Sequence, residues 1–327
     1  MKSVAPPRSL RRHVSAERAA TLMKRATWAS VGVAAVLIAV KAWAFAVTGS
    51  MALLATLFDS LLDGAASVVN LIAVRVALTP ADRQHRFGHG KAEALAGLGQ
   101  AALIGASALF LASESVSRLL DPQPIDRSLE GIGVIVASLA LTLGLVSYQR
   151  YVQRRTGSLA IAADSLHYAS DFVLNFGVIA ALVIAGVFGV VWADAAIALV
   201  LAAWIAYAAW EIVARSTSEL MDRQLPREDR LRIEEIALSH PEVYTIHDLR
   251  TRQAGRTVFI QFHLEMEGGL TLRRAHAICD EVEAAIEADF PDAEILIHQD
   301  PAGHETVPDE MQPESPLAPG APDGTAG

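Results

Sequence analysis

The sequence predicts an α-helical membrane domain of six transmembrane helices, followed by a small cytoplasmic α+β domain with the element order αββαβ. Of the 327 residues, 52% are hydrophobic and 19% are charged, and the mean hydropathy of +0.34 is high for a soluble chain. Residues 1–222 carry 18 Lys and Arg against 15 Asp and Glu, whereas residues 223–327 carry 9 against 21. A nearly neutral apolar part therefore precedes an acidic part.

Six segments are long and apolar enough to cross a bilayer, which takes roughly 20 helical residues. They lie near residues 26–47, 51–78, 93–119, 129–151, 158–187 and 193–214. We expect an N-terminal tail over residues 1–25, a transport-type membrane domain over 26–215, a soluble domain over 216–300 and a disordered acidic tail over 301–327. The first span follows a long basic tail and lacks a clear cleavage site, so it is not interpreted as a signal peptide.

Basic residues in alternate connections predict the orientation, because loops rich in Lys and Arg stay in the cytoplasm. The N-terminal tail is basic, and two later loops carry Arg83, Arg86 and Lys91, then Arg150, Arg154 and Arg155. The tail and the two loops thus indicate the same orientation. Both termini and the acidic domain are therefore expected in the cytoplasm.

Composition also excludes several classes of protein. The single cysteine excludes an intramolecular disulfide framework and a thiolate-rich metal site. The net charge of −9 argues against a nucleic-acid surface. We find no phosphate-binding glycine-rich loop and no nucleophile elbow, so neither ATP-driven pumping by this chain nor an organic cofactor is expected.

Ionisable side chains inside two spans are the first candidate site, because such groups are costly in lipid. Asp59 and Asp63 are four residues apart in the second span, and so are His167 and Asp171 in the fifth. Each pair shares a helix face. Two helices that turn these faces together would present three carboxylates and one imidazole, which suits a borderline divalent cation.

Two further ionisable residues have weaker interpretations. Asp164 lies three residues before His167 and could join the site, but we favour a solvated or supporting carboxylate near the cytoplasmic end. Lys41 in the first span is expected to extend toward the outer surface.

The loop after the second span is a second candidate. Asp82, His85 and His89 have the three- and four-residue spacing that gathers ligands on a helical turn, but Gly88 and Gly90 make a regular helix unlikely throughout. On spacing alone, a metal site and a polar loop with scattered histidines are equally good interpretations.

The soluble domain is predicted from its periodicity. A helix begins after Pro226, strands cover residues 242–251 and 257–265, an amphipathic helix covers 271–289, and a last strand covers 294–299. Histidines fall on three strands and a helix, and Asp300 shares a strand face with His298. A metal cluster is predicted from His247, His263, His276, His298 and Asp300. Cys279, one turn from His276, is expected to be a small packed residue.

These features together resemble the cation diffusion facilitator family, and most closely its bacterial ferrous-iron and zinc efflux members. The resemblance covers roughly residues 20–301. Beside the two in-span pairs, the stretches that carry it are Phe87-Gly88-His89-Gly90-Lys91-Ala92-Glu93, His247-Asp248-Leu249-Arg250-Thr251-Arg252 and Ile297-His298-Gln299-Asp300-Pro301.

The resemblance implies a metallochaperone-like cytoplasmic domain, a homodimer in the bacterial inner membrane, and three metal sites in each subunit. Asp59, Asp63, His167 and Asp171 match the transport site. Asp82, His85 and His89 match a loop site, which favours the metal interpretation there. The five soluble-domain ligands match a two-metal cluster with Asp300 as the bridge. Lys91 and Asp222 match a charged interlock between the subunits.

The implied function is efflux of a divalent cation, Zn²⁺ or Fe²⁺ and possibly Cd²⁺, in exchange for protons. His167 must be neutral and the carboxylates ionised to bind metal, so protons and metal compete. Two other classes stay open on the residues: a membrane metalloenzyme, whose usual nucleophile or helix motif we do not find, and a metal sensor without transport.

Overall fold

The computed structural model describes residues 15–49, 51–120, 132–188, 192–291, 293–303, 308 and 312–314. These residues divide into two compact units that meet in sequence at Ser218 and Glu219. The first unit holds the long helices, and the second holds the sheet. Each unit is described by itself.

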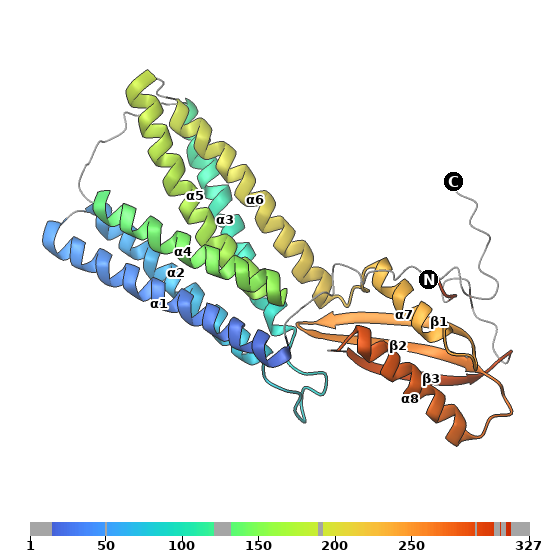
Figure 1. Ribbon diagram of the computed structural model, residues 1–327. Coiled ribbons are helices and arrows are strands. Elements are labelled where there is room, and N and C mark those ends of the chain that lie inside the picture. The colour runs from blue at the N-terminus through green and yellow to red at the C-terminus, as the bar shows by residue number, and fades with distance from the viewer. Residues whose placement is uncertain are drawn as a thin grey trace. The chain divides into compact units, whose positions relative to one another are not determined.

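The helical unit consists, in its described residues, of six long helices. They are α1 (Ala16–Thr48), α2 (Met51–Ala77), α3 (Ala92–Leu120), α4 (Ile132–Thr156), α5 (Leu159–Phe188) and α6 (Ala193–Leu220) (Figure 1). Glycines end two of them: Gly49 after α1 and Gly157 after α4 have φ values of 65° and 69°, a left-handed conformation that glycine adopts without strain.

The length and composition of these helices fit a bilayer. Over the described residues, Glu17–Val47, Thr56–Ala77, Ala92–Leu120 and Ala195–Leu220 are long and apolar enough to cross it. The helices α4 and α5, with 25 and 30 residues, also have the length for a hydrocarbon core of about 30 Å. Large apolar side chains such as Trp43, Leu62 and Phe110 are exposed on the helical unit, as lipid-facing residues should be.

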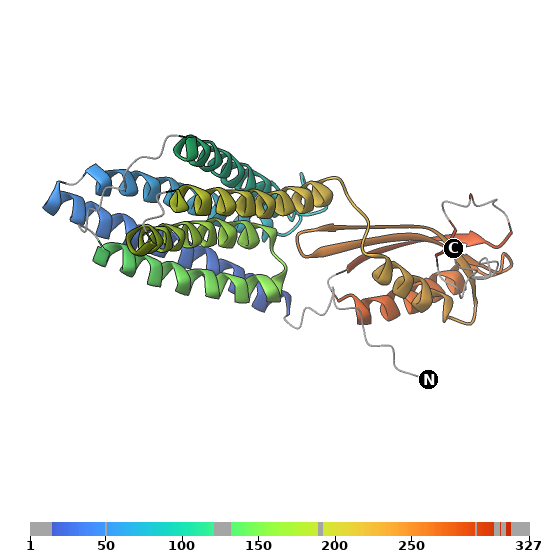
Figure 2. The same ribbon diagram turned by 90° about the horizontal axis from the view of Figure 1, so that it is seen from above.

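The sheet unit has the predicted order of elements: α7 (Arg227–Leu238), β1 (Val243–Ala254), β2 (Thr257–Met266), α8 (Leu272–Asp289) and β3 (Ala293–Pro301). The central strand β2 pairs antiparallel with β1 and parallel with β3. Figure 2 shows α7 and α8 on the same face of this sheet. Thr271 caps α8, since its side chain accepts a hydrogen bond from the backbone N–H of Arg274.

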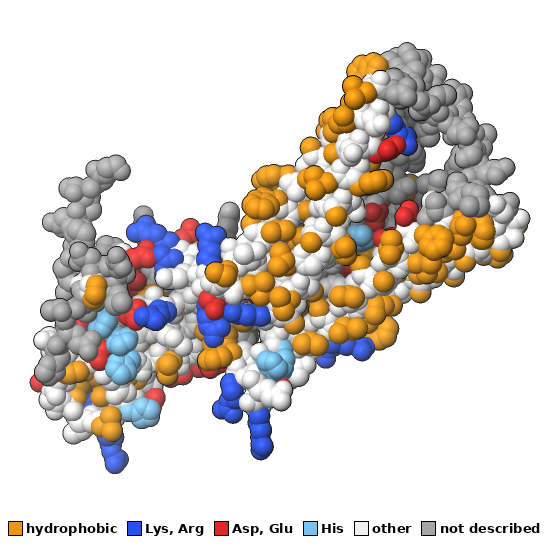
Figure 3. Space-filling view, turned by 180° about the vertical axis from the view of Figure 1, so that it is seen from behind, with side chains coloured by type: hydrophobic (Ala, Val, Ile, Leu, Met, Phe, Trp, Pro, Cys, Tyr) orange, Lys and Arg blue, Asp and Glu red, His pale blue; other side chains and the backbone are white. Residues whose placement is uncertain are grey.

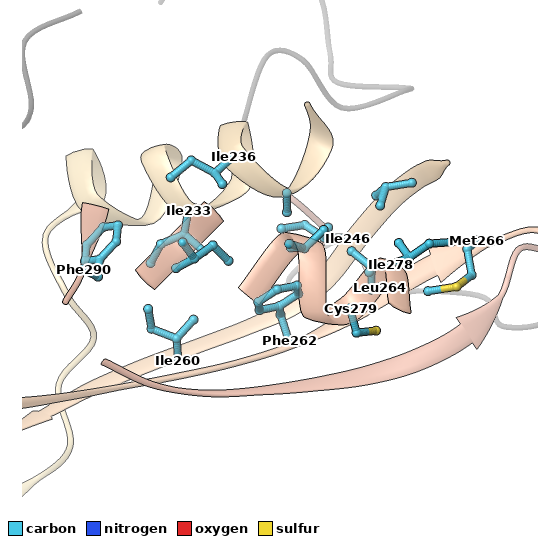
Figure 4. Close-up of a cluster of buried hydrophobic side chains, with 14 of the residues drawn as sticks. Ile233, Ile236, Ile246, Ile260, Phe262, Leu264, Met266, Ile278, Cys279 and Phe290 are labelled. Atoms are coloured by element: carbon cyan, nitrogen blue, oxygen red, sulfur yellow. The ribbon is translucent and has the colours of Figure 1, made fainter. Parts of the chain in front are cut away.

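The core of this unit lies between the two helices and one face of the sheet (Figure 4). Along β2, Ile260, Phe262 and Leu264 are buried in that core, as the alternation in the sequence predicts. His263, between two of them, therefore points to the opposite face. The strand histidines His247, His263 and His298, which are aligned across the sheet, therefore lie on the sheet face that α7 and α8 leave uncovered.

The last strand continues through Pro301, and the backbone N–H of Ala302 still donates to the carbonyl of Met266 at 2.8 Å. Ordered contacts therefore reach slightly beyond the boundary expected at residue 300. Most of the segment 304–327 lies outside the described residues, but Gln312, Pro313 and Glu314 are among those described.

Candidate metal centres

Three of the four predicted transport ligands come together between α2 and α5. The imidazole Nε2 of His167 lies 2.8 Å from Oδ1 of Asp63 and 3.7 Å from Oδ2 of Asp171. One ligand atom from each of the three residues lies within 4.8 Å of the others, a grouping able to hold a metal ion. The two helix faces inferred from the four-residue spacing do meet.

The fourth predicted ligand, Asp59, lies one turn before Asp63 on α2. It lines the same cavity of about 1040 Å³ as Asp63, His167 and Asp171. In Figure 3, carboxylate and imidazole side chains lie in a hollow flanked by hydrophobic side chains. Asp59 is not part of the group within 4.8 Å, so its place in the cage stays a prediction.

Lys41 on α1 also lines this cavity, contrary to the expectation that it extends toward the outer surface. Its Nζ donates to Ser60 Oγ at 2.6 Å and to the carbonyl of Thr56 at 3.1 Å. The charges of Asp59, Asp63 and Asp171 act on this ammonium group. A lysine within a membrane span indicates a polar partner, but only the packing of α1 on α2 reveals that the partners are Ser60 and the carbonyl of Thr56.

Asp164 does not join the group of ligands. It is 1% exposed, so the interpretation as a solvated carboxylate is wrong. Buried hydroxyl and amide donors from other helices surround it instead.

The loop between α2 and α3 brings its three predicted ligands together. Asp82 Oδ2 lies 3.5 Å from His89 Nε2, and Asp82 Oδ1 lies 3.6 Å from His85 Nδ1. The two imidazole rings are 4.6 Å apart. The backbone N–H groups of His85 and Gln84 donate to Asp82 Oδ1 and hold the pKa of this carboxyl below its ordinary value. A turn, rather than a helix, supplies this geometry.

The sheet unit gathers four of its five predicted ligands. Residues His247, His263 and His298 occupy one row across the three strands. Asp300 Oδ2 lies 2.6 Å from His263 Nδ1 and 3.6 Å from His247 Nε2, and Asp300 Oδ1 lies 3.3 Å from His298 Nε2. Asp300 therefore touches all three imidazoles, a position suited to a bridging carboxylate.

Sequence reasoning missed Glu265 at this cluster. Its Oε1 lies 3.2 Å from His247 Nδ1, and its backbone pairs with that of Asp300 on the neighbouring strand. The signal was available, because Glu265 is two residues after His263 on the same strand face.

His276 lies apart from this cluster. Its side chain is 70% exposed on α8, and its Nε2 lies 3.8 Å from Asp280 Oδ2. Cys279, on the same helix, is buried in the apolar core as expected, and burial raises the pKa of its thiol. A metal-binding role of His276 stays a prediction.

The two residues of the expected interlock lie at the ends of long helices. Lys91 directly precedes α3, and Asp222 follows α6 with a φ of 55°. Asp222 Oδ1 accepts a hydrogen bond from Arg252 Nη1 at 3.4 Å. Pairing between Lys91 and Asp222 stays a prediction.

Comparison with known proteins identifies both units. Residues 27–221 match the family model of the cation efflux transmembrane domain, and residues 225–302 match that of the cation efflux protein cytoplasmic domain. The cation-efflux pump FieF of Shewanella oneidensis is 47% identical over 279 residues, which are 85% of this chain and 94% of that protein. FieF of Cronobacter sakazakii is 47% identical over 280 residues, 86% and 93% of the two chains.

Among solved structures, CzrB in its zinc form is 36% identical and covers 26% of this chain and 99% of its own, with a TM-score of 0.25. The family models together span most of the chain. The chain belongs to the cation diffusion facilitator family of cation efflux transporters.

Proposed function

We propose that this protein exports a divalent metal cation across the bacterial inner membrane in exchange for protons. The observation that carries the proposal is the convergence of Asp63, His167 and Asp171 beside a cavity between membrane helices. Ionisable groups at such a place are costly in lipid and mark the route of a cation.

The ligand chemistry indicates the cargo. One imidazole with up to three carboxylates, the third from Asp59, favours Zn²⁺ or Fe²⁺ and also accepts Cd²⁺. The nitrogen ligand makes the site softer than an all-oxygen cage, which would suit Mg²⁺ or Ca²⁺.

Protons compete with the metal for the same atoms. His167 Nε2 and Asp63 Oδ1 share a hydrogen bond of 2.8 Å. A metal ion requires the deprotonated forms of both groups, so its binding releases protons and its exit allows them to return. Alternating access of one site to the two sides of the membrane then couples efflux to proton entry.

The sheet unit is proposed to bind metal and thereby to regulate transport or stabilise a homodimer. Two or three imidazoles around one carboxylate fit zinc, and the bound charge would offset the repulsion in an acidic domain. His276, exposed on α8, is proposed as a further ligand of this cluster. If His263→Ala removed metal without changing dimer stability or transport, the regulatory role would fail.

The other classes considered above fit less well. A membrane metalloenzyme needs an open coordination position and a catalytic group, and a metal sensor has no need of carboxylate pairs in two membrane helices. The relatives named above are cation-efflux pumps, which also favours transport.

Flux in proteoliposomes tests the proposal. Uptake of Zn²⁺, Fe²⁺, Cd²⁺ and Mn²⁺ should be compared, singly and in competition, with and without a pH gradient. We expect Zn²⁺ or Fe²⁺ flux that accelerates when the gradient drives protons in the opposite direction. A metal flux that does not depend on the pH gradient would refute proton antiport but would leave metal efflux as the function.

A further inference from the structure

The membrane unit contains a buried carboxylate that the transport chemistry above does not use. Asp164 lies on α5, three residues before His167, and is 1% exposed. It is not one of the grouped ligand atoms. A carboxylate at such a place is retained only where donors compensate for the loss of water.

Three other helices supply those donors. Ser30 Oγ on α1 donates to Asp164 Oδ2 at 2.5 Å, and Gln149 Nε2 on α4 donates to the same oxygen at 2.6 Å. Gln100 Nε2 on α3 donates to Oδ1 at 3.2 Å. The Gln149 amide is also 2.8 Å from Ser30 Oγ. Four helices are therefore joined at one side chain.

All four members of this network are buried, with exposed fractions of 6% or less. Hydrogen bonds are directional, and the low polarity of a buried site strengthens them. The network therefore specifies the relative positions of the four helices more sharply than apolar contacts, which are non-directional.

The network lies where two sets of helices meet. Figure 1 shows α3, α5 and α6 diverging from α1, α2 and α4 with distance from the start of α5. Near that start, an apolar cluster packs four helices together; its buried members are Met23, Ala26, Val74, Val152, Ala160 and Ile161. The carboxylate of Asp164 is thus placed near the vertex of the two sets.

The proposed transport site is divided between these sets. Asp63 lies on α2, in one set, and His167 and Asp171 lie on α5, in the other. One helical turn separates Asp164 from His167. A shift of α5 at Asp164 would therefore change the distance between the two halves of the cage directly.

We propose that Asp164 is a positioning residue for metal transport, which ties the first turns of α5 to α1, α3 and α4 and thereby sets the approach of His167 to Asp63. The ends of the helices that lie far from Asp164 are not held by this network, so they can move relative to one another. The proposal rests on the transport site proposed above.

Zinc flux into proteoliposomes under a fixed pH gradient tests it, with rates expressed per folded dimer. Asp164→Asn keeps a similar shape and one acceptor oxygen but replaces the second acceptor with an NH2 donor. We expect the KM for Zn²⁺ to rise about tenfold, a usual size for coupling between sites. Ser115→Ala is the matched control, because Ser115 is also buried and its hydroxyl donates to the carbonyl of Leu111 in its own helix; it should keep the wild-type KM.

A swap distinguishes positioning from a local role of the carboxylate. The double variant Asp164→Asn with Gln149→Glu exchanges the carboxyl and amide groups across the 2.6 Å contact between α5 and α4, and should restore KM to within about twofold if the link between the helices is what matters. A wild-type KM in Asp164→Asn, or a double variant as impaired as the single one, would overturn the proposal. Asp63→Ala, measured in parallel, tests the transport site separately. If this variant kept its Zn²⁺ flux, the proposed transport site would be refuted, whatever the KM of the Asp164 variants.

Discussion

His167 Nε2 and Asp63 Oδ1 lie 2.8 Å apart although 104 positions separate the two residues in the chain. A hydrogen bond joins two of the atoms that the proposed transport site would offer to a cation. A cation bound there would replace a proton at this contact. Competition between metal and proton at these atoms is therefore the physical basis of the proposed exchange.

Replacement of Asp63 is the most direct test of this site. Asp63→Ala should lower Zn²⁺ flux in proteoliposomes by at least about a hundredfold, because it removes the partner of His167 and a charged ligand at once. Phe58→Ala is a suitable control, since Phe58 lies on the same helix and is 60% exposed. Unchanged flux in Asp63→Ala, with the dimer intact by light scattering, would remove Asp63 from the site.

Lys41 should weaken metal binding at the same cavity. Its amino group lines the cavity together with three carboxylates, and in its protonated form it repels a cation more strongly where water is scarce. We expect Lys41→Met to tighten Zn²⁺ binding about tenfold, equivalent to ~1.4 kcal/mol. Equilibrium binding against a chelating dye measures this effect in a background that lacks the other sites (Asp82→Ala, His263→Ala and His298→Ala).

Val36→Met provides the control for that substitution, because Val36 lies on the exposed face of α1. It introduces the same side chain without touching the cavity. Weaker zinc binding in Lys41→Met than in Val36→Met would contradict the electrostatic argument and indicate that Lys41 mainly holds α1 to α2.

The sequence predicted which side chains share a face wherever a single helix or strand determines it. The four-residue spacing of Asp59 with Asp63 places both on one face of a single helix. Alternation along β2 likewise places His263 on the face opposite to the core. In both cases the period of the element is enough, and the structure places these residues as predicted.

Contacts between elements were harder to predict. The donors to Asp164 come from Ser30, Gln100 and Gln149, and each is an ordinary polar residue within its own helix. The rotation of each helix and its neighbours decide whether such residues meet, and hydropathy does not contain that information. The same reason explains why Lys41 was expected to extend outward and instead bonds to α2.

The loop site should keep its carboxylate ionised across the physiological range. The backbone N–H groups of His85 and Gln84 lower the pKa of Asp82, so its stabilising contribution is complete above the unfolded-state pKa and is lost only as the pH falls through the lower folded value. Protonation of Asp82 should therefore not be the cause of any loss of metal from the loop between pH 7 and pH 5.

Asp82→Asn tests this assignment. The substitution should weaken Cd²⁺ binding to the loop by about tenfold or more, while the midpoint of metal release on acidification stays within about 0.5 pH units of wild type. Arg83→Gln, an exposed neighbour, is the control. A midpoint that moved by more than one unit in Asp82→Asn would mean that this carboxylate titrates in the range measured.

The final prediction concerns the acidic tail, where Glu314 bonds to α7. Arg227 Nε donates to Glu314 Oε2 at 3.0 Å, Arg230 Nε donates to Oε1 at 3.1 Å, and a second nitrogen of Arg230 also contacts Oε1. Partial burial raises the pKa of Glu314, but the hydrogen bonds from Arg230 and Arg227 outweigh it and hold the pKa below its ordinary value. The contact is therefore complete at neutral pH and weakens only as the pH falls through that lowered pKa.

Glu314→Gln should release this segment at pH 7, because a neutral amide loses the charge-assisted bonds to both arginines. Proteinase K should then cleave the tail several-fold faster than in wild type, since cleavage follows the population of the opened form. Glu228→Gln is the matched control, as Glu228 is exposed on the same helix, α7. Equal cleavage rates in all three proteins would show that the ion pairs do not hold the tail against α7.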